Sequence, residues 1–195
     1  MKKTTLLFLI AGLLLAGSLN AQKHEVRANL GLATTADIGD VFSDLIVTVI
    51  TVDGYSTNNS ESFGAIGFEY WYFQSDLLKL GGLFSYQAID KEVFYLGDKA
   101  GDITNSYYTI MPEINLEYVR SEWVQLYSGI GAGITILSQN FNSTKTEVAS
   151  SSASEIIFNF HVNAIGMRIG KAFGASVELG VGAKGIFNAG LNYRF

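Results

Sequence analysis

Acidic side chains within alternating stretches of the chain are the first candidates for chemistry. Four of them are flanked by apolar or aromatic residues: Glu69, Glu113, Glu117 and Glu178. Converging carboxylates could bind a metal ion or act as general acid and base. They could also pair with the cationic side chains Arg27, Lys79 and Arg194, and with Arg168 if a bulge shifts its register. We favour the ion pairs and keep the metal or acid–base site as the alternative.

The two histidines and one glycine-rich stretch could also carry chemistry. A histidine beside a serine or an acid could catalyse hydrolysis or acyl transfer, but neither stands at a recognisable spacing around His161. We expect His161 to be a polar interior residue and His24 to lie at a rim. The stretch from Gly180 to Gly185 matches G-x-G-x-x-G, yet the chain ends too soon afterwards for a dinucleotide site. We expect a hairpin there and no cofactor.

Most of the chain alternates with a period of two, which predicts β-strands. In the first segment Val26, Ala28 and Leu30 share one face, while Arg27 and Asn29 share the other. The same pattern predicts eight strands, at residues 26–32, 66–72, 78–87, 108–118, 124–136, 156–163, 173–181 and 187–195.

The two faces of these strands differ in a way that a soluble protein would not tolerate. One face is large and apolar with aromatic residues toward segment ends, and the other is small and polar with charges deep inside the strands. In a narrow barrel such charges can point inward and pair with one another. The pattern predicts an all-β fold, an eight-stranded antiparallel up-and-down transmembrane β-barrel, with Ile130 and Leu179 facing lipid.

The connections between strands alternate in length, which is typical of outer-membrane barrels. Residues 35–61, 90–105 and 138–155 form long connections, while 74–76, 120–122 and 169–172 are short; only the last, near 182–185, breaks the alternation. This predicts short periplasmic turns, longer extracellular loops and both mature termini in the periplasm.

Pro112 is an exception to the strand pattern. It lies within a predicted strand although it lacks an N–H donor, so we expect a local bulge or an unpaired carbonyl there.

The N-terminal residues and the overall charge bear on location and partners. Lys2 and Lys3, the apolar run 6–17 and Ala21 predict a secretory signal peptide at 1–21, followed by one barrel domain at 22–195. Without this segment the chain has 11 Lys and Arg and 18 Asp and Glu, which gives a net charge of −7. This acidic balance disfavours nucleic acid as a partner. The absence of cysteine excludes disulfides and thiolate metal sites.

The first long connection contains a pattern unlike the strands. Apolar residues at positions 38, 41, 42, 45, 46 and 49 follow the spacing of a helix, behind a capping Asp37, while the β-branched residues at 46–52 favour a strand extension instead. A short helix in the first extracellular loop is expected, with strand extension as the alternative. Its role would be a plug over the barrel mouth or a lip for lipid or a partner, and the candidate interaction segment comprises Asp37, Asp40, Phe42, Asp44 and Leu45.

The long connections are also acidic. They contain eleven Asp and Glu against Lys91, Lys99 and Lys145, with Lys184 in the final hairpin counted as a further outward charge. Such a rim could bind divalent cations, attract basic partners, or simply be solvated.

The end of the chain resembles the small bacterial outer-membrane β-barrels of the OmpX/OmpA type. Tyr193 and Phe195 match the alternating aromatic C-terminal strand of that family, and the stretch from Gly180 to Gly190 is similar to its last hairpin. The resemblance implies a Gram-negative outer membrane, contact with its lipid, and recognition of Tyr193 and Phe195 by the barrel-assembly machinery. The resemblance bears on location and fold far more than on activity, and our first expectation is a non-enzymatic barrel with a structural or surface-interaction role through its acidic loops. A narrow channel or hydrophobic-ligand carrier and a lipid-modifying enzyme are the alternatives.

Overall fold

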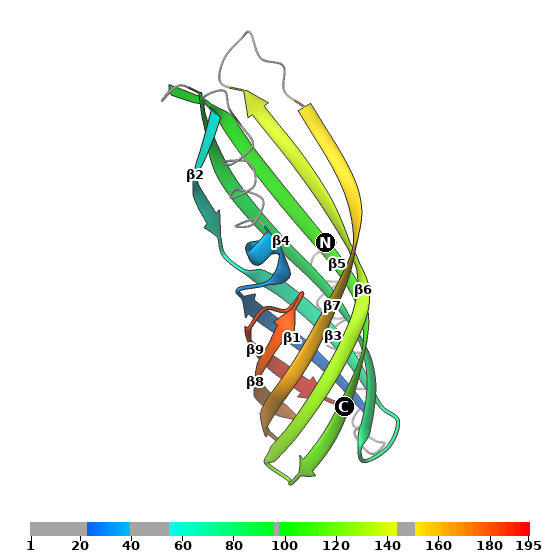
Figure 1. Cartoon of the computed structure of the whole chain (residues 1–195). Coiled ribbons are helices and arrows are strands. Elements are labelled where there is room, and N and C mark those ends of the chain that lie inside the picture. Colours follow the sequence, from blue (N-terminus) through cyan, green and yellow to red (C-terminus); the bar gives the residue numbers. More distant parts are fainter. Residues whose placement is uncertain (1–22, 40–54, 96–97, 144–150) are drawn as a thin grey trace, which may run out of the picture.

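The computed structural model describes residues 23–39, 55–95, 98–143 and 151–195. Within these ranges it contains nine strands (Figure 1). They are β1 (His24–Leu32), β2 (Tyr55–Ser62), β3 (Ala65–Phe73), β4 (Leu78–Tyr95), β5 (Asp98–Arg120), β6 (Val124–Ser143), β7 (Ser151–Gly170), β8 (Phe173–Gly182) and β9 (Phe187–Arg194). The predicted signal peptide lies outside the described residues.

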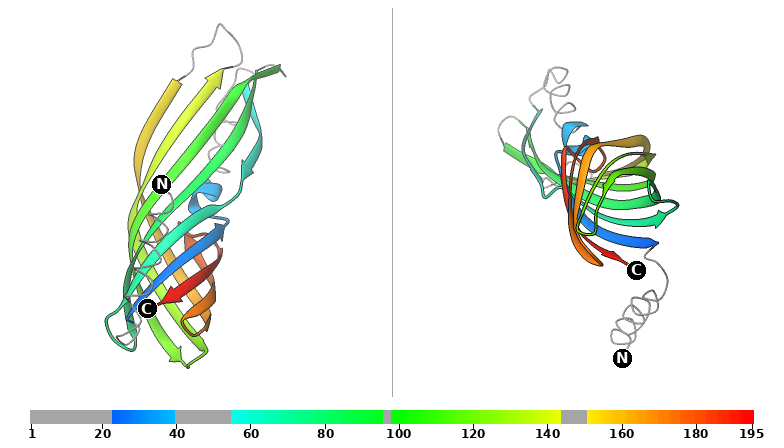
Figure 2. Two further views of the ribbon diagram at one scale, coloured as in Figure 1. Left: turned by 180° about the vertical axis from the view of Figure 1, so that it is seen from behind. Right: turned by 90° about the horizontal axis from the view of Figure 1, so that it is seen from below.

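Eight of these strands close into a ring, so the expected eight-stranded antiparallel barrel is confirmed. The order runs β4-β3-β1-β9-β8-β7-β6-β5, and β5 pairs with β4 to complete the circle (Figure 2). The remaining strand, β2, is not part of the ring. It pairs with the upper part of β4. The short turns at 74–77, 121–123 and 171–172 and the C-terminal Phe195 lie at one end of the barrel (Figure 1).

The alternation of each strand turns its apolar side chains outward. In β3, Ile66 and Phe68 are 55% and 54% exposed, whereas Glu69 and Trp71 are fully buried. Because the outward side chains are the apolar ones, the barrel is apolar outside and polar inside, the reverse of a soluble core. Ile130 and Leu179 point outward, as the sequence predicts.

The wall of the barrel is much taller on one side than on the other. Strands β4 to β7 have 18 to 23 residues, whereas β8 and β9 have 10 and 8. About 9–11 residues suffice to cross a bilayer as a tilted strand. The tall strands therefore continue as a sheet beyond the shorter ones (Figure 1).

This extension corrects the prediction of long loops. Residues 90–105 pair as a hairpin that reaches Tyr95 opposite Asp98, and pairing also continues through most of 138–155. Residues 55–62, expected within the first loop, form β2. These segments show no regular alternation of apolar and polar residues from which strands could be predicted, because 55–62 and 138–155 are mostly polar and 93–96 is a continuous apolar run.

A bulge in β7 brings Arg168 into the interior, which is the condition under which the sequence allows Arg168 to join the ion pairs. In the ladders to both β6 and β8 the extra residue lies on β7, next to Ala164. After it the side-chain phase changes, and Arg168 is fully buried.

Pro112 causes no bulge. It pairs with Gly82 of β4, and the register to β6 is the same before and after it; the ladder only omits Met111 and Pro112 on that side. The bulge of β5 falls instead between Glu117 and Val119. Among the described residues, no helix is long and apolar enough to cross a membrane.

Candidate functional site

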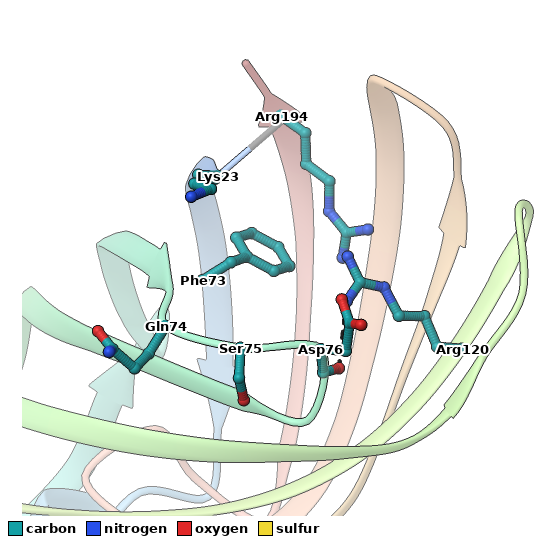
Figure 3. Close-up of a pocket in the computed structure, with 7 residues that line it drawn as sticks. All are labelled: Lys23, Phe73, Gln74, Ser75, Asp76, Arg120 and Arg194. Carbon is teal, nitrogen blue, oxygen red and sulfur yellow. Dashed lines mark hydrogen bonds and ion pairs between the residues drawn. The ribbon is translucent and has the colours of Figure 1, made fainter. Parts of the chain in front are cut away.

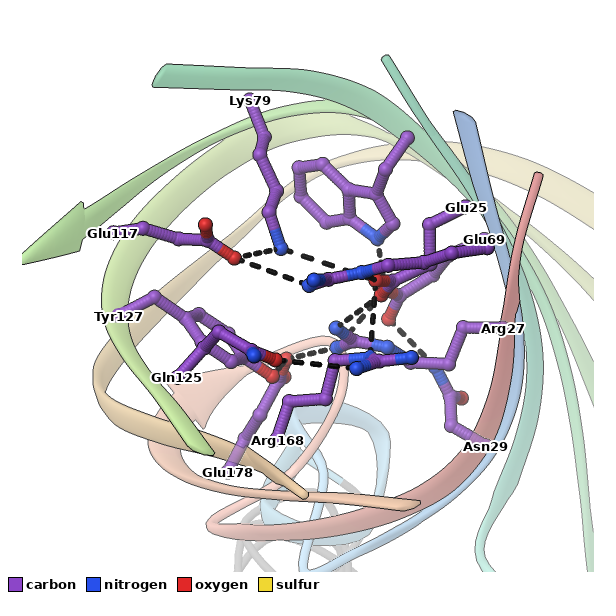
Figure 4. Close-up of polar contacts among 12 residues, drawn as sticks. Glu25, Arg27, Asn29, Glu69, Lys79, Glu117, Gln125, Tyr127, Arg168 and Glu178 are labelled. Carbon is purple, nitrogen blue, oxygen red and sulfur yellow. Dashed lines mark hydrogen bonds and ion pairs between the residues drawn. The ribbon is translucent and has the colours of Figure 1, made fainter. Parts of the chain in front are cut away.

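Within the described part of the chain, ten buried side chains form connected ion pairs inside the barrel, and we call them the interior network. Its members are Glu25, Arg27, Glu69, Lys79, Glu113, Glu117, Arg168, Glu178, Lys184 and Arg194. They come from β1, β3, β4, β5, β7, β8 and β9 and from the last hairpin, and most converge in one layer (Figure 4). The inward phase of each strand places them there, because every second residue points to the axis.

Arg27 of β1 lies at the centre of this network. Its guanidinium pairs with Glu178, lies 3.1 Å from Glu25 Oε1 and lies 3.3 Å from Glu69 Oε2. Its Cζ also lies 5.4 Å from the centroid of the Tyr127 ring. A planar guanidinium has five N–H donors, so one arginine can join several strands.

Lys184 links a second group of carboxylates. Its ammonium lies 2.8 Å from Glu178 Oε2, 3.2 Å from Glu69 Oε1 and 3.2 Å from Glu113 Oε1. The side chain is 2% exposed, which corrects the expectation of an outward charge. Lys184 lies in a tight turn between Gly182 and Gly185, whose φ angles of +133° and +88° only glycine adopts easily. This turn directs the Lys184 side chain into the barrel.

The part of the network near the turns is organised around Glu25 and Glu117. Arg194 Nε donates to Glu25 Oε2 at 2.6 Å, and Arg194 Nη2 donates to Glu117 Oε1 at 3.3 Å. Lys79 pairs with Glu117, and Arg168 Nε lies 3.2 Å from Glu25 Oε2. Arg168 also donates to three backbone carbonyls of the 170–172 turn, at 2.6 to 3.2 Å. This turn is therefore tied to the interior.

Neutral side chains add hydrogen bonds to two of these carboxylates, Glu69 and Glu178. Trp71 Nε1 and Asn29 Nδ2 donate to Glu69 at 2.7 and 2.6 Å, and the Tyr127 hydroxyl donates to Glu178 at 2.8 Å. Trp71 and Tyr127 are both fully buried. Their rings fill the interior beside the charges, so the network forms a packed layer across the barrel.

The charges of the network cancel within the described residues, with five carboxylates against five cations. Buried charges are tolerated when they are paired and hydrogen-bonded. Each carboxylate here lies within 4.0 Å of at least one cation. This arrangement can fix the shape of the barrel and block its axis.

The structure brings together the predicted Glu69, Glu113, Glu117, Glu178 and Arg194, and adds two members that the sequence reasoning missed. Glu25 shares the phase of Arg27 two residues later, so the alternation alone could have placed it inside. Lys184 was missed because it lies in a turn, where no alternation fixes its direction.

Neither histidine lies in a catalytic arrangement. His161 is 2% exposed, and its ring nitrogens make no hydrogen bond within the described part of the chain. His24 lies at the rim, where its Nδ1 is 2.6 Å from the Tyr70 hydroxyl and its ring stacks on Phe195. The stretch from Gly180 to Gly185 forms the end of β8 and a turn, as the hairpin prediction requires.

The candidate segment of the first loop lies mostly outside the described residues, including Asp40, Phe42, Asp44 and Leu45. Residues 35–39 are helical. Both oxygens of the Asp37 carboxylate are hydrogen-bonded: Oδ2 accepts from the Thr34 N–H at 2.8 Å, and Oδ1 accepts from Gln87 Nε2 at 2.6 Å. In return the Asp37 N–H donates to the Thr34 hydroxyl. This is a reciprocal cap that ties the helical turn to β4.

Four acidic residues of the predicted rim lie as two pairs on the outer face of the extended sheet. Glu61 faces Asp90, and Glu92 faces Asp102, across neighbouring strands. Lys99 lies 2.7 Å from Asp102 and 2.8 Å from Glu92, and hydrogen bonds to these two carboxylates raise the pKa of Lys99. No group of three or more Asp, Glu, His or Cys placed to hold a metal ion occurs among the described residues. Lys91, predicted to lie on this rim, is buried instead.

A hollow of about 570 Å³ opens at the turn end of the barrel (Figure 3). Arg120 and Arg194 point toward Phe73 there, with Cζ atoms 5.7 and 4.8 Å from its ring centroid. Arg120 is already paired with Asp76 at 2.7 Å, and Arg194 with Glu25. Because Arg194 belongs to the interior network, this hollow adjoins the network at the turn end.

No family model matches the sequence, and no curated protein matches it. Among solved structures, the chain is similar to Ail, the attachment invasion locus protein of Yersinia pestis, in complex with the heparin analogue sucrose octasulfate, at 18% identity and a TM-score of 0.46, covering 89% of this chain and 99% of that chain. Two further structures of Ail, one of them in a phospholipid bilayer nanodisc, give 16% identity and TM-scores of 0.44 and 0.40, each covering 90% of this chain and 100% of that chain.

Proposed function

We propose that the chain is an integral outer-membrane protein with a closed barrel, which interacts at the cell surface through its extended sheet. The observation that carries the proposal is the inversion of the barrel, with apolar side chains outside and a charge-balanced network inside. In lipid, a closed barrel leaves no backbone group unpaired along its ring, whereas in water its outer face would be an exposed apolar surface.

The packed network supports a closed barrel in preference to a channel. An eight-stranded barrel has an interior that side chains can fill, and here Arg27, Trp71 and Tyr127 fill it together with the carboxylates. Ions would have to displace paired charges to pass along the axis. We assign no reaction to the chain.

The extended sheet supports the surface role. It carries the acidic pairs Glu61–Asp90 and Glu92–Asp102 on its outer face. An acidic surface attracts basic partners, and divalent cations could bridge it to anionic lipid headgroups. For biogenesis, we propose that residues 1–21 direct export and that Tyr193 and Phe195 are read by the barrel-assembly machinery. The short turns and the termini of the mature chain would then face the periplasm.

Membrane insertion and conductance test this proposal together. The full mature chain refolded into phospholipid vesicles should float with them in a density gradient and resist extraction by alkaline carbonate. In planar bilayers it should give no stepwise conductance.

A variant with part of the network removed provides the contrast. Tyr127→Gly removes the buried ring and should produce small conductance steps, while Trp123→Gly, at an exposed turn position, should remain silent. Conductance steps of the unaltered protein would contradict a closed barrel, and failure to float would contradict the membrane assignment.

A further inference from the structure

The barrel wall has a side opening at the place where its height changes. The ladder between β7 and β8 begins at His161 opposite Gly182, and β7 continues upward to Ser151 with β6 as its partner. The Phe160 carbonyl still accepts the Ala183 N–H at 2.9 Å. Above this point, no strand among the described residues pairs with the edge of β7 that faces β8 lower down.

A cavity of about 470 Å³, the side cleft, lies at this opening. Apolar groups form most of its surface: Ala36 of the helical turn, Tyr107 of β5, Leu137 of β6, and Ile157, Phe158 and Phe160 of β7. Pockets of about 300–1,000 Å³ with apolar walls are typical of small-molecule sites. The interior network and the acidic rim contribute no residue to the cleft.

The entrance of the cleft is continuous with the apolar outer surface. Phe158 and Phe160 are 72% and 42% exposed, and Ile156, on the same face of β7, is 66% exposed. These residues belong to the band that would face hydrocarbon. A molecule dissolved in the membrane could therefore enter the cleft sideways without passing through water.

The polar part of the cleft is uncharged. Gln139 Nε2 donates to Asn105 Oδ1 at 3.0 Å, and the Thr35 hydroxyl donates to Asn159 Oδ1 at 3.1 Å. No Asp, Glu, Lys or Arg lines the cleft among the described residues. Amides and a hydroxyl can hydrogen-bond a neutral headgroup, but they would not compensate a buried charge.

We propose that the side cleft holds the hydrocarbon tail of a neutral single-chain lipid that enters from the membrane. The tail lies against Leu137 and Ile157, and the headgroup meets the amides near Asn105 and Gln139. This inference rests on the membrane placement proposed above and adds a ligand site that a purely structural barrel does not need.

Photo-crosslinking tests the site directly. The probe is a monoacylglycerol with a diazirine at the end of its chain, added to vesicles that contain the full mature protein, and the labelled residues are mapped by mass spectrometry. We expect labels on inward residues, Leu137 and Ile157. Labels confined to outward residues, such as Ile134 and Ile156, would overturn the proposal.

Two matched pairs of variants separate the cleft from general contact with lipid. Ala36→Phe fills the cleft and should reduce inward labelling at least fivefold, whereas Ala175→Phe, on the outer face of β8, should leave it unchanged. Leu137→Gln should also reduce it, and Ile136→Gln, on the opposite face of the same strand, should not.

The folded fraction of each variant is read from the mobility of the unheated protein in gels, so a folding defect is not mistaken for lost binding. Equal inward labelling in all folded variants would overturn the site. Flotation of the same vesicles shows separately whether the membrane placement itself has failed.

Discussion

The effect of a single side chain on the stability of this barrel depends on the side of the wall that the side chain faces. An outward position needs an apolar side chain, and an inward charge needs a partner of opposite sign. Lys184 shows the second rule most clearly, since one ammonium lies within 3.2 Å of three carboxylates.

Replacing Lys184 by Met should therefore leave Glu69, Glu113 and Glu178 with too little positive charge. We expect the free energy of unfolding to fall by about 3–5 kcal/mol, the range for breaking a buried ion pair from one side. Urea titration of the protein in vesicles measures it. Adding Glu113→Gln should restore part of the loss, whereas Lys171→Met, which removes an exposed pair with Glu122, should cost about 0–1 kcal/mol. Equal losses in Lys184→Met and Lys171→Met would contradict the network.

The outward rule predicts the effect of a charge on the lipid face. Ile130→Arg places a guanidinium on an outward position of β6 that is 61% exposed. If this position lies near the bilayer midplane, the cost is about 2–4 kcal/mol. The same titration measures it, with Asn140→Arg, on the same face of β6 but higher in the extended sheet, as the control. A barrel that tolerates both changes equally does not face lipid at Ile130.

At the scale of elements, strands were predictable in the band where a membrane would require an apolar outward face and a polar inward face. Alternation of apolar and polar residues located all eight strands of the ring, and the phase of Arg168 showed that only a bulge in β7 would bring it inside. Above that band neither face meets hydrocarbon or a filled interior. The polar segments 138–143 and 151–155 therefore read as loops, although backbone pairing continues through them.

Turns limited the prediction of the site in a similar way. The direction of Lys184 depends on the φ angles of Gly182 and Gly185, which hydropathy does not encode. The sequence predicts a capping role for Asp37, and its carboxylate does accept from the Thr34 N–H at the start of the helical turn, but its contact with Gln87 of β4 was not predicted. Long-range contacts of this kind become visible only when the strands are placed in space.

The cap makes a prediction for the helical turn at 35–39. Asp37→Ala removes the hydrogen bonds that its carboxylate accepts from Thr34 and Gln87. The bond from the Thr34 hydroxyl to Gln87 Oε1 remains, so the turn should be held to β4 less tightly. The loss of a cap costs about 0.5–2 kcal/mol. Hydrogen exchange of the Ile38 amide, which donates to the Thr34 carbonyl, should speed up accordingly. Asp102→Asn is the control, and identical exchange in both variants would show that the cap contributes nothing.

The pairing of Lys99 in the hairpin of β4 and β5 leads to a prediction about how the stability of this hairpin depends on pH. Hydrogen bonds to Asp102 and Glu92 raise the pKa of Lys99 above its ordinary value of 10.5. A raised pKa means that the charged form is favoured in the fold, so this stabilisation is present below pH 10.5 and is lost as the pH rises through the higher folded value. An NMR titration of the Lys99 ammonium measures the pKa, and Asp102→Asn should lower it. A pKa that the variant leaves unchanged would show that the pairing is not formed in solution.

At the scale of the whole molecule, the two ends of the barrel differ. One end carries the short turns, and the other carries the tall sheet (Figure 1). In outer-membrane barrels short turns face the periplasm. Because the chain has no cysteine, single-cysteine reporters can test this orientation without background labelling.

We expect Asn142→Cys, high in β6, to react with a membrane-impermeant maleimide in intact cells. Ser121→Cys, in a short turn, should react only after the outer membrane is permeabilised. Mass spectrometry of the labelled protein gives both extents of reaction. The reverse pattern would place the extended sheet in the periplasm and remove the basis of the surface role.

The pairing of β1 with β9 also has a consequence for the time course of folding. This seam joins residues that are far apart in the chain, and the Arg194–Glu25 hydrogen bond spans 169 positions. Contacts of such sequence separation form slowly, because the entropy of a long loop is lost before the contact can compensate it. Until β9 arrives, β1 has an unpaired edge that can pair with other chains. Any factor that assists assembly must therefore hold the chain until the eight residues of β9 have paired with β1. Substitutions at this seam should delay closure even where they leave the finished barrel stable.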